Sequence, residues 1–288
     1  MENNGVRTKQ TSIPPPPPPP PPSFLKNSKC TDLRTKIVNS GNCLNANEQT
    51  SRLKYVFRDT DLLIVSYCNS VHSIIQEGPS CGIVALSMAS QFFNNIDTSD
   101  ILACAKKFNF SRSGEVFSAY NMSELASLLL DCDAFVINDL KNNVHMILSH
   151  ICKGLPVLMP YDADKNHEPG FNNGRCAHWA VISGLCFQLQ KDEDLNYDLM
   201  SSGLKVHIVS TEMLNEELLS NASNVHVYAY QGKSKHLGVW DLNTLISSNN
   251  NMHEVTQKYG IEELVLPAGD TLSELRDKAV LLKKKFFK

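Results

Sequence analysis

The chain has 288 residues, of which 42% are hydrophobic and 20% charged, and its formal net charge is -3 at pH 7. This length suffices for one large domain or two small ones with an ordinary buried core. The balance excludes the strongly basic character of nucleic-acid-binding proteins, and no apolar run approaches the roughly 18 residues that cross a membrane.

The first part of the chain, residues 1–54, is polar and is predicted to be disordered. It contains nine consecutive prolines, which fix φ, lack an N–H and therefore form a polyproline II rod. Such a rod is ordered before binding and fits aromatic grooves on partner proteins; a stiff spacer is the alternative. The predicted partner-binding residues are Pro14, Pro15, Pro16, Pro17, Pro18, Pro19, Pro20, Pro21 and Pro22.

The folded domain is predicted to span residues 55–288, with helices dominating its first half. The run 62–76 is largely apolar and fits either a strand or a helix, because its periodicity does not separate the two. Apolar patterns and capping residues predict helices at 81–93, 101–108, 124–130 and 144–154, and strands at 133–138 and 155–161.

The second half of this domain is rich in β-branched and aromatic residues between turn signals, which is typical of strands. Strands are predicted at 178–189, 205–210, 225–232 and 236–241, and helices at 241–248 and 271–286. Helices first and strands afterwards predict an α+β fold, in which a helical N-terminal half packs on an antiparallel β-sheet half.

The nine cysteines are odd in number, and no two form the Cys-x-x-Cys pair that zinc sites use. Most lie in apolar surroundings, where free cysteine behaves as a small hydrophobic residue. An unpaired set of this kind is typical of a reducing compartment, and the polar N-terminus lacks the apolar stretch of a signal peptide. We therefore expect a cytoplasmic protein.

The sequence predicts no metal and no cofactor. Asp162, Asp164 and Asn166 match the opening of an EF-hand calcium loop. However, the glycine that such a loop requires is His167 here, and the required glutamate is Asn173. No glycine-rich nucleotide-binding motif occurs.

The segment Gln76–Gly82 carries the strongest chemical signal. A Gly-Pro turn delivers Cys81 to the start of an apolar helix, where unpaired N–H groups and the helix dipole favour the thiolate. Gly82 leaves room for a substrate, and Gln76 can aim a side-chain N–H at the oxyanion that forms on attack. Cys81 is therefore the predicted nucleophile, whereas burial is the simpler interpretation of the other cysteines.

A cysteine nucleophile needs a base, and His178 is the best placed of the nine histidines. It follows a glycine-rich polar loop and opens an apolar run, a junction that places a side chain at the mouth of a cleft. Papain-type enzymes have the same order, with the histidine far downstream of the cysteine. Asp241 is the candidate that orients His178, with Asn243 as the alternative; a plain helix N-cap is the other interpretation of Asp241.

Three segments in order resemble the actin maturation protease family: QEGPSCGIVALSMAS, MPYDADKNHEPGFNNGRCAHWAVISG and YAYQGKSKHLGVWDLNTLISSN. That family resembles the C39-like branch of papain-fold cysteine peptidases, so the resemblance implies a papain-like cysteine protease fold. It covers about residues 60–285, and the proline-rich N-terminus also fits.

The resemblance also implies a reaction and two partners. The family removes the acetylated N-terminal methionine or cysteine from immature actin, and its proline-rich segment recruits profilin. Cys81 matches the family nucleophile and His178 its histidine. Gln76 matches the oxyanion glutamine, with a spacing to the cysteine one residue shorter than relatives often have. Asp241 would match the family aspartate, although the chain between it and His178 is longer than usual.

Two other classes of function stay open from the sequence. One is a different papain-fold hydrolase, such as a deubiquitinase. The other is a non-enzymatic adaptor whose proline rod binds profilin.

Overall fold

The computed structural model describes residues 46–57, 61–189, 198–199, 204–255, 264–267 and 271–285. These residues belong to one compact unit that spans Ser40–Lys288. The unit starts upstream of the boundary predicted at residue 55, because helix α2 (Ala46–Val56) buries Leu53 completely in the core. The polyproline run Pro14–Pro22 lies outside the described residues.

The helices and strands follow the predicted order closely as far as residue 250. The further helices are α3 (Cys81–Ser90), α4 (Thr98–Lys107), α5 (Ala119–Leu129), α6 (Val144–Cys152), η1 (a 3-10 helix, Thr211–Met213), α7 (Glu216–Ser220) and α8 (Leu242–Asn250). The strands are β1 (Ile64–Cys68), β2 (Cys132–Asn138), β3 (Val157–Asp162), β4 (Ala177–Leu189), β5 (Asp198–Leu199), β6 (Lys205–Ile208), β7 (Ala222–Gln231), β8 (Gly238–Asp241) and β9 (Lys278–Lys284).

The strands form one sheet in the order β2-β9-β3-β4-β1-β6-β5, with β7 paired to β4 and β8 paired to β7. The long strand β4 is its centre. Strand β3 pairs with the first part of one edge of β4 and β1 with the next part, while β7 runs along the opposite edge. All pairings of β4 are antiparallel; the start of this strand, which carries the site, pairs with β3, and the pairing with β7 begins at Ala180.

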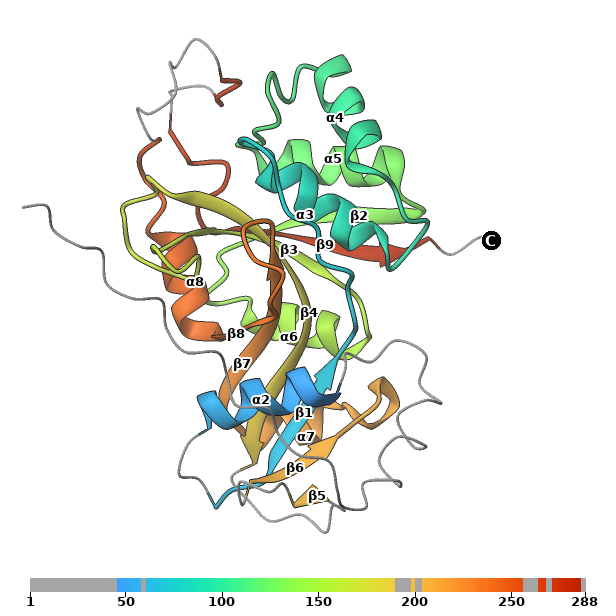
Figure 1. The fold of residues 1–288 in the computed structure, drawn as a ribbon, viewed down its shortest axis with the longest axis vertical. Coiled ribbons are helices and arrows are strands. Elements are labelled where there is room, and N and C mark those ends of the chain that lie inside the picture. The colour runs from blue at the N-terminus through green and yellow to red at the C-terminus, as the bar shows by residue number, and fades with distance from the viewer. Residues whose placement is uncertain are drawn as a thin grey trace, which may run out of the picture. The chain divides into compact units, whose positions relative to one another are not determined.

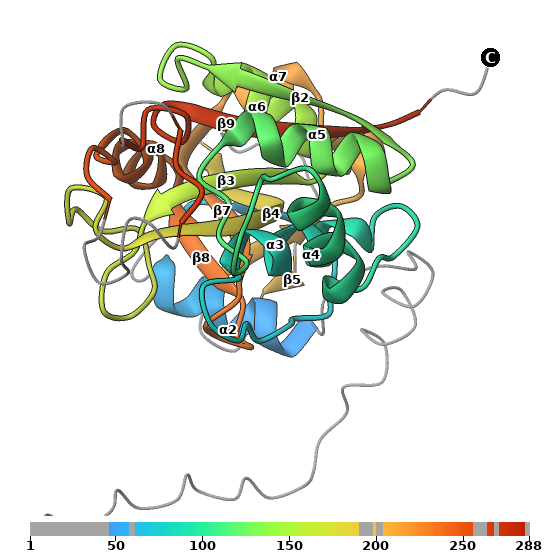
Figure 2. The same cartoon turned by 90° about the horizontal axis from the view of Figure 1, so that it is seen from above.

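Helices cover both faces of the sheet (Figures 1 and 2). Helices α3, α4 and α5 lie together in both views, and their apolar residues share one core cluster with Trp179 and Val181 of β4. Ala180 and Ile182 point to the other face, where α6 and α8 pack. This period of two is that of a strand buried on both sides. The predicted α+β class, with first-half helices packed on a sheet, is confirmed; the sheet is antiparallel except for the parallel pair β1 and β6.

The helix predicted at 271–286 is wrong. Residues 278–284 form strand β9, which pairs with the whole length of β2 and with part of β3. Ala279 contributes to one core cluster and Val280 to the other. A short apolar run that is buried on both faces shows no polar alternation, so its pattern alone does not separate a strand from a buried helix.

Candidate active site

A cavity of about 210 Å³ lies where the start of α3 meets the start of β4. It brings together Gln76, Cys81 and His178, three of the residues predicted from the sequence. The other walls come from the loop before β4, from the turn after β7 and from apolar side chains. The residues contributing to these walls include Val116, Phe117, Gly174, Arg175, Cys176, Lys233, Val255, Leu264 and Leu275.

Cys81 is the first residue of α3, as predicted. The turn before it is closed by a hydrogen bond of 2.7 Å from the Ser80 hydroxyl to the Glu77 carbonyl. Gly78 has φ +62°, a left-handed conformation that glycine adopts without strain. The tight turn thus ends with the Cys81 thiol at the helix N-terminus and facing the cavity.

Gly82 has a role different from the expected one. A Cβ at this position would meet Met122, Trp179 and Val116, each at 3.1 Å. Glycine therefore lets α3 pack closely against β4, next to His178, and the space it leaves is filled by these side chains rather than open to a substrate.

Gln76 is buried between two turns. Its backbone N–H donates to the Gly232 carbonyl at 2.8 Å, and its Nε2 donates to the Gly78 carbonyl at 2.8 Å. A primary amide has two N–H donors, so the second remains available to a group in the cavity. A Cβ on Gly232 would come within 2.8 Å of Gln76 Oε1, so glycine is needed there for this packing.

His178 is the second residue of β4 and lies opposite Tyr161 of β3. The centres of the two rings are 6.2 Å apart, and the ring of His167 is also 6.2 Å away. Nδ1 of His178 is buried and has no hydrogen-bond partner among the described residues. A buried ring nitrogen without a partner costs free energy, which is a common sign of a group kept ready for a reaction.

Burial is the main influence on the pKa values of Cys81 and His178. Burial raises the pKa of the Cys81 thiol; the backbone N–H groups of Trp179 and Gly82 and the Lys233 ammonium act in the opposite direction. The predicted effect of the helix start is therefore present but outweighed. Burial also lowers the pKa of His178 to about 4, helped by the charges of Lys233 and His167. At neutral pH the pair consists of a thiol and a neutral imidazole, so His178 can accept the thiol proton.

The structure does not bring Asp241 to this cavity. Asp241 pairs with His226 of β7, which pairs with Cys186 of β4. Cys186 lies eight residues beyond His178 on β4, a separation of roughly 26 Å at about 3.3 Å per residue. Asp241 is instead the N-cap of α8 and accepts hydrogen bonds from the N–H and the hydroxyl of Thr244, both at 2.7 Å.

The alternative residue, Asn243, also lies away from His178. It lines a separate cavity with Phe171 and Ile246. Neither residue predicted to orient the histidine is therefore placed to do so. The prediction was wrong because Asp241 lies at the end of β8, which pairs through β7 with a part of β4 that is remote from His178.

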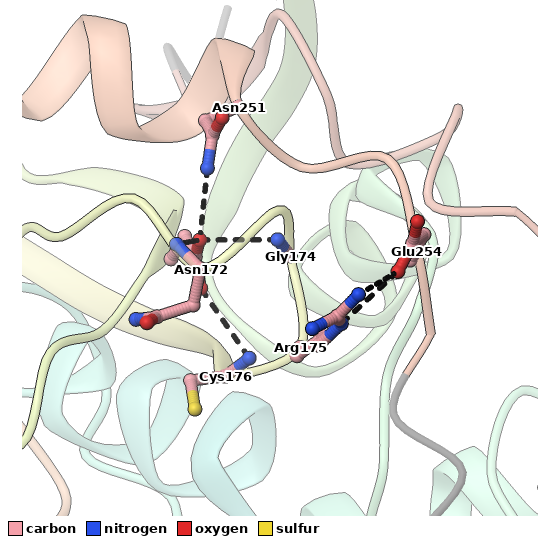
Figure 3. A network of polar contacts seen from close by, with 7 residues as sticks. Asn172, Gly174, Arg175, Cys176, Asn251 and Glu254 are labelled. Carbon is pink, nitrogen blue, oxygen red and sulfur yellow. Dashed lines mark hydrogen bonds and ion pairs between the residues drawn. The ribbon is translucent and has the colours of Figure 1, made fainter.

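Asp162 is a residue whose role the sequence did not reveal; the residues that donate hydrogen bonds to it, Asn172, Gly174, Cys176 and Asn251, are labelled in Figure 3. Its carboxylate is fully buried and accepts hydrogen bonds from the backbone N–H groups of Asn172, Gly174 (3.0 Å) and Cys176 (3.3 Å), and from Nδ2 of Asn251 (3.1 Å). The loop that it holds leads directly into His178. Asp162 therefore fixes the wall of the cavity and the start of β4 together.

The same loop is tied to the segment that follows α8. The carbonyl of Asn173 accepts hydrogen bonds from the N–H groups of His253 (3.2 Å) and Glu254 (2.9 Å). Arg175 forms an ion pair of 3.0 Å with Glu254, seen at the right of Figure 3. Both of these side chains are more than half exposed, so the ion pair adds little stability, and the backbone contacts hold the loop.

With this geometry in view, comparison with known proteins assigns the family. The family model described as "Actin maturation protease-like, C-terminal domain" matches residues 71–186. A protein named actin maturation protease from Mus musculus is 33% identical over 273 residues, 90% of this chain and 75% of that protein. Proteins of the same name from Bos taurus (33% over 265 residues, 87% and 76%) and Danio rerio (31% over 234 residues, 77% and 75%) are also similar.

The chain belongs to the actin maturation protease family.

This assignment confirms the resemblance seen in the three sequence segments and makes the chain a protease. The stretch matched by the actin maturation protease model contains Gln76, Cys81, Asp162 and His178 and ends before Asp241. A weaker structural likeness, with a TM-score of 0.38 and 12% identity, is to a C39-like peptidase from Bacillus anthracis; it covers 75% of this chain and 95% of that one. The assignment does not rest on it.

Two further features bear on what surrounds the site. Within the parts of the chain that the structure describes, no helix has the length and apolar character needed to cross a membrane. The same parts contain no group of three or more His, Cys, Asp and Glu side chains arranged to hold a metal ion. In the segment that resembles a calcium loop, Asp164 accepts backbone hydrogen bonds from Asn166 (2.8 Å) and Glu168 (2.9 Å).

Proposed function

We propose that this chain is a cysteine-type aminopeptidase that removes the N-acetylated first residue, methionine or cysteine, from immature actin. The acidic mature N-terminus of actin is the product. The observation that carries the proposal is the meeting of Cys81, His178 and Gln76 on one small cavity. Its volume is below the roughly 300–1,000 Å³ of pockets for drug-sized ligands, which suits a single blocked residue better than a long peptide segment.

The reaction is acyl transfer through a thioester. His178 takes the proton of the Cys81 thiol as its sulfur attacks the carbonyl carbon of the acetylated first residue. Nε2 of Gln76 and the backbone N–H of Cys81 donate to the oxyanion. When the C–N bond breaks, His178 gives its proton to the departing amine, which is the new N-terminus of actin. Water then attacks the thioester, releasing the acetylated amino acid and restoring the thiol.

The hydrogen bonds made by the Glu115 carboxylate in the cavity wall favour an acetylated substrate over one with a free N-terminus. An enzyme that binds a free N-terminus needs a carboxylate for its ammonium group, and Glu115 is the acidic residue among the described wall residues. Its two oxygens already accept hydrogen bonds from the N–H groups of Arg112, Ser113 (both 2.8 Å) and Val265 (3.0 Å), and from the Ser111 hydroxyl (3.4 Å). Val116 and Phe117 form an apolar part of the wall that suits an acetyl group and a methionine side chain.

The proposal extends to the N-terminal segment. The proline run Pro14–Pro22 binds profilin, which presents actin monomers, and the reaction takes place in the cytoplasm. This part rests on the sequence and the family resemblance. Deleting Pro14–Pro22 is expected to weaken profilin binding and to slow actin processing in cells; unchanged binding and processing would return the segment to the role of a spacer.

Mass spectrometry of the actin N-terminus tests the reaction itself. Wild-type protein is expected to convert acetylated immature actin to the mature form, and Cys81→Ala to leave it unprocessed. Cys104→Ala, which changes a partly buried cysteine of α4 outside the cavity, is the matched control and keeps full processing.

The same preparation separates the alternatives. Ubiquitin conjugates are incubated in parallel with an N-acetylated actin peptide, and cleavage of the conjugates alone would replace this proposal with a deubiquitinase. If Cys81→Ala supported normal actin processing in cells, a non-enzymatic adaptor would be the better account.

A further inference from the structure

Lys233 lies beside the catalytic pair, although 55 positions separate it from His178 in the chain (233 minus 178). Strands β4 and β7 run antiparallel with the pairs Ile182–Ala229, Val181–Tyr230 and Ala180–Gln231. The pairing ends at Ala180–Gln231, and the turn that follows carries Lys233 at the same end of the sheet as His178. The backbone N–H of Lys233 donates to Oε1 of Gln231 at 2.6 Å, which fixes the turn.

The turn that carries Lys233 is also tied to the other side of the cavity. The residue before it, Gly232, accepts the hydrogen bond from the Gln76 backbone. Lys233 itself lines the cavity with Cys81 and His178. Its ammonium charge disfavours protonated His178 and favours ionised Cys81, as expected of a cation close to both groups.

The ammonium group of Lys233 has no counter-charge in the described part of the chain. The ion pair found there joins Arg175 and Glu254 and does not involve Lys233. Glu115, the acidic residue of the cavity wall, already accepts hydrogen bonds from backbone N–H groups on both of its oxygens. The Lys233 side chain is exposed on the side of the cavity. A cation placed this way favours an anionic group on whatever binds in the cavity.

We propose that Lys233 is a specificity-determining residue that binds the acidic side chain of the residue directly after the scissile bond. The inference rests on the proposed function. His178 hands its proton to the departing amine, so the groups that line the cavity with His178 are within reach of the departing chain, and Lys233 is one of them. On immature actin this residue becomes the acidic N-terminus of the product.

The same contact favours the reaction as well as binding. A substrate carboxylate beside Lys233 offsets the positive charge that disfavours protonated His178. The histidine then accepts the thiol proton more readily when an acidic substrate is bound than when a neutral one is. Lys233 thus links recognition of the leaving chain to the basicity of the catalytic histidine.

Peptide kinetics test this assignment. Two N-acetylmethionyl peptides are compared, one with Asp and one with Asn after the methionine, using wild type, Lys233→Met and Lys235→Met. A charge-assisted hydrogen bond predicts that wild type favours the Asp peptide by about tenfold in kcat/KM. Lys233→Met is expected to reduce this ratio to about one, through slower cleavage of the Asp peptide. Lys235 is exposed on the same turn but does not line the cavity, so Lys235→Met keeps the ratio.

Charge reversal gives a second measurement that does not depend on total activity. Lys233→Glu is expected to favour a peptide with Lys after the methionine over the Asp peptide, the reverse of wild type. Circular dichroism melts verify that the variants are folded. If wild type cleaves both peptides and Lys233→Met keeps the wild-type ratio, the role of Lys233 is overturned while the proposed function stands. If wild type cleaves neither peptide nor acetylated actin, both are overturned.

Discussion

The carboxylate of Asp162 accepts a hydrogen bond of 3.0 Å from the backbone N–H of Gly174, twelve residues further along the chain. It holds two further backbone N–H groups and the amide of Asn251 in the same way. One buried side chain therefore closes the loop that ends at His178. An ionised carboxylate only accepts hydrogen bonds, so all of its lone pairs are available to N–H donors of this loop.

Asp162→Asn is expected to lower the free energy of unfolding by about 2–4 kcal/mol, because it turns an amide N–H₂ toward buried N–H groups and leaves at least one of them unsatisfied. In the fraction that stays folded, kcat/KM falls as the start of β4 loses its support. Urea denaturation and peptide kinetics measure the two effects. Asp164→Asn is the control, because asparagine keeps the oxygen that accepts from Asn166 and Glu168. Equal stability of the two variants would contradict the role given to Asp162.

His150 of α6 makes the stability of the fold depend on pH. Burial lowers its pKa to about 4, although its Nε2 contacts the Leu282 carbonyl at 2.9 Å. The unfolded chain, with an ordinary histidine pKa of about 6.5, binds the proton first as the pH falls. This stabilisation is therefore fully present above pH 6.5 and is lost between about pH 6.5 and 4, up to roughly 3 kcal/mol.

Denaturant unfolding at a series of pH values measures this loss. His150→Leu is expected to be less stable at pH 7 and to lose less stability on acidification. His145 is exposed on the same helix, and His145→Leu keeps the wild-type slope. A slope that His150→Leu leaves unchanged would mean that other groups cause the acid sensitivity.

We expect His178 to set the acidic limit of catalysis. Its pKa is lowered to about 4, while burial raises the pKa of Cys81. The neutral pair is the reactive form in the free enzyme, so kcat/KM is expected to hold from about pH 5 through neutrality and to fall near pH 4. Lys233→Met removes a charge that disfavours protonated His178, which predicts an acid limb at higher pH. The profile is measured with an uncharged acetylated peptide; an acid limb already near pH 6.5 would contradict the burial of His178.

Asp241→Ala separates helix capping from catalysis. Loss of the two hydrogen bonds to Thr244 is expected to cost about 1 kcal/mol of stability. The folded variant keeps kcat/KM, because β7 and much of β4 separate Asp241 from His178. Thermal melts and peptide kinetics on the same preparation distinguish the two effects. A hundredfold loss of kcat at unchanged stability would restore Asp241 to the catalytic site.

The parts of the site predicted from the sequence are those defined by near neighbours. Cys81 and Gln76 flank one Gly-Pro turn, and His178 marks a loop-to-strand junction, so local pattern was enough. Asp241 failed because its distance from His178 depends on strand order and register. Lys233 could not be told from Lys235 without the folded turn, which places only Lys233 of the two in the cavity wall.

The fold shows the same division between local and long-range information. The helix start at Cys81 and the strand at 178–189 follow from local composition. The final strand β9 was missed because its apolar residues are buried on both faces by helices more than 100 residues away in the chain, α5 on one face and α6 on the other. Asp162 resembled part of a calcium motif, and its partners become visible only once the loop has closed on it.

The pair Cys81 and His178 spans the boundary between two layers, since one residue belongs to the helical layer and the other to the sheet. Ninety-seven positions separate them in the chain (178 minus 81), and a contact of such long range costs loop-closure entropy. Catalytic activity therefore depends on the packing of the helical layer against the sheet. Moderate denaturant is therefore expected to abolish turnover while the helical circular dichroism signal persists.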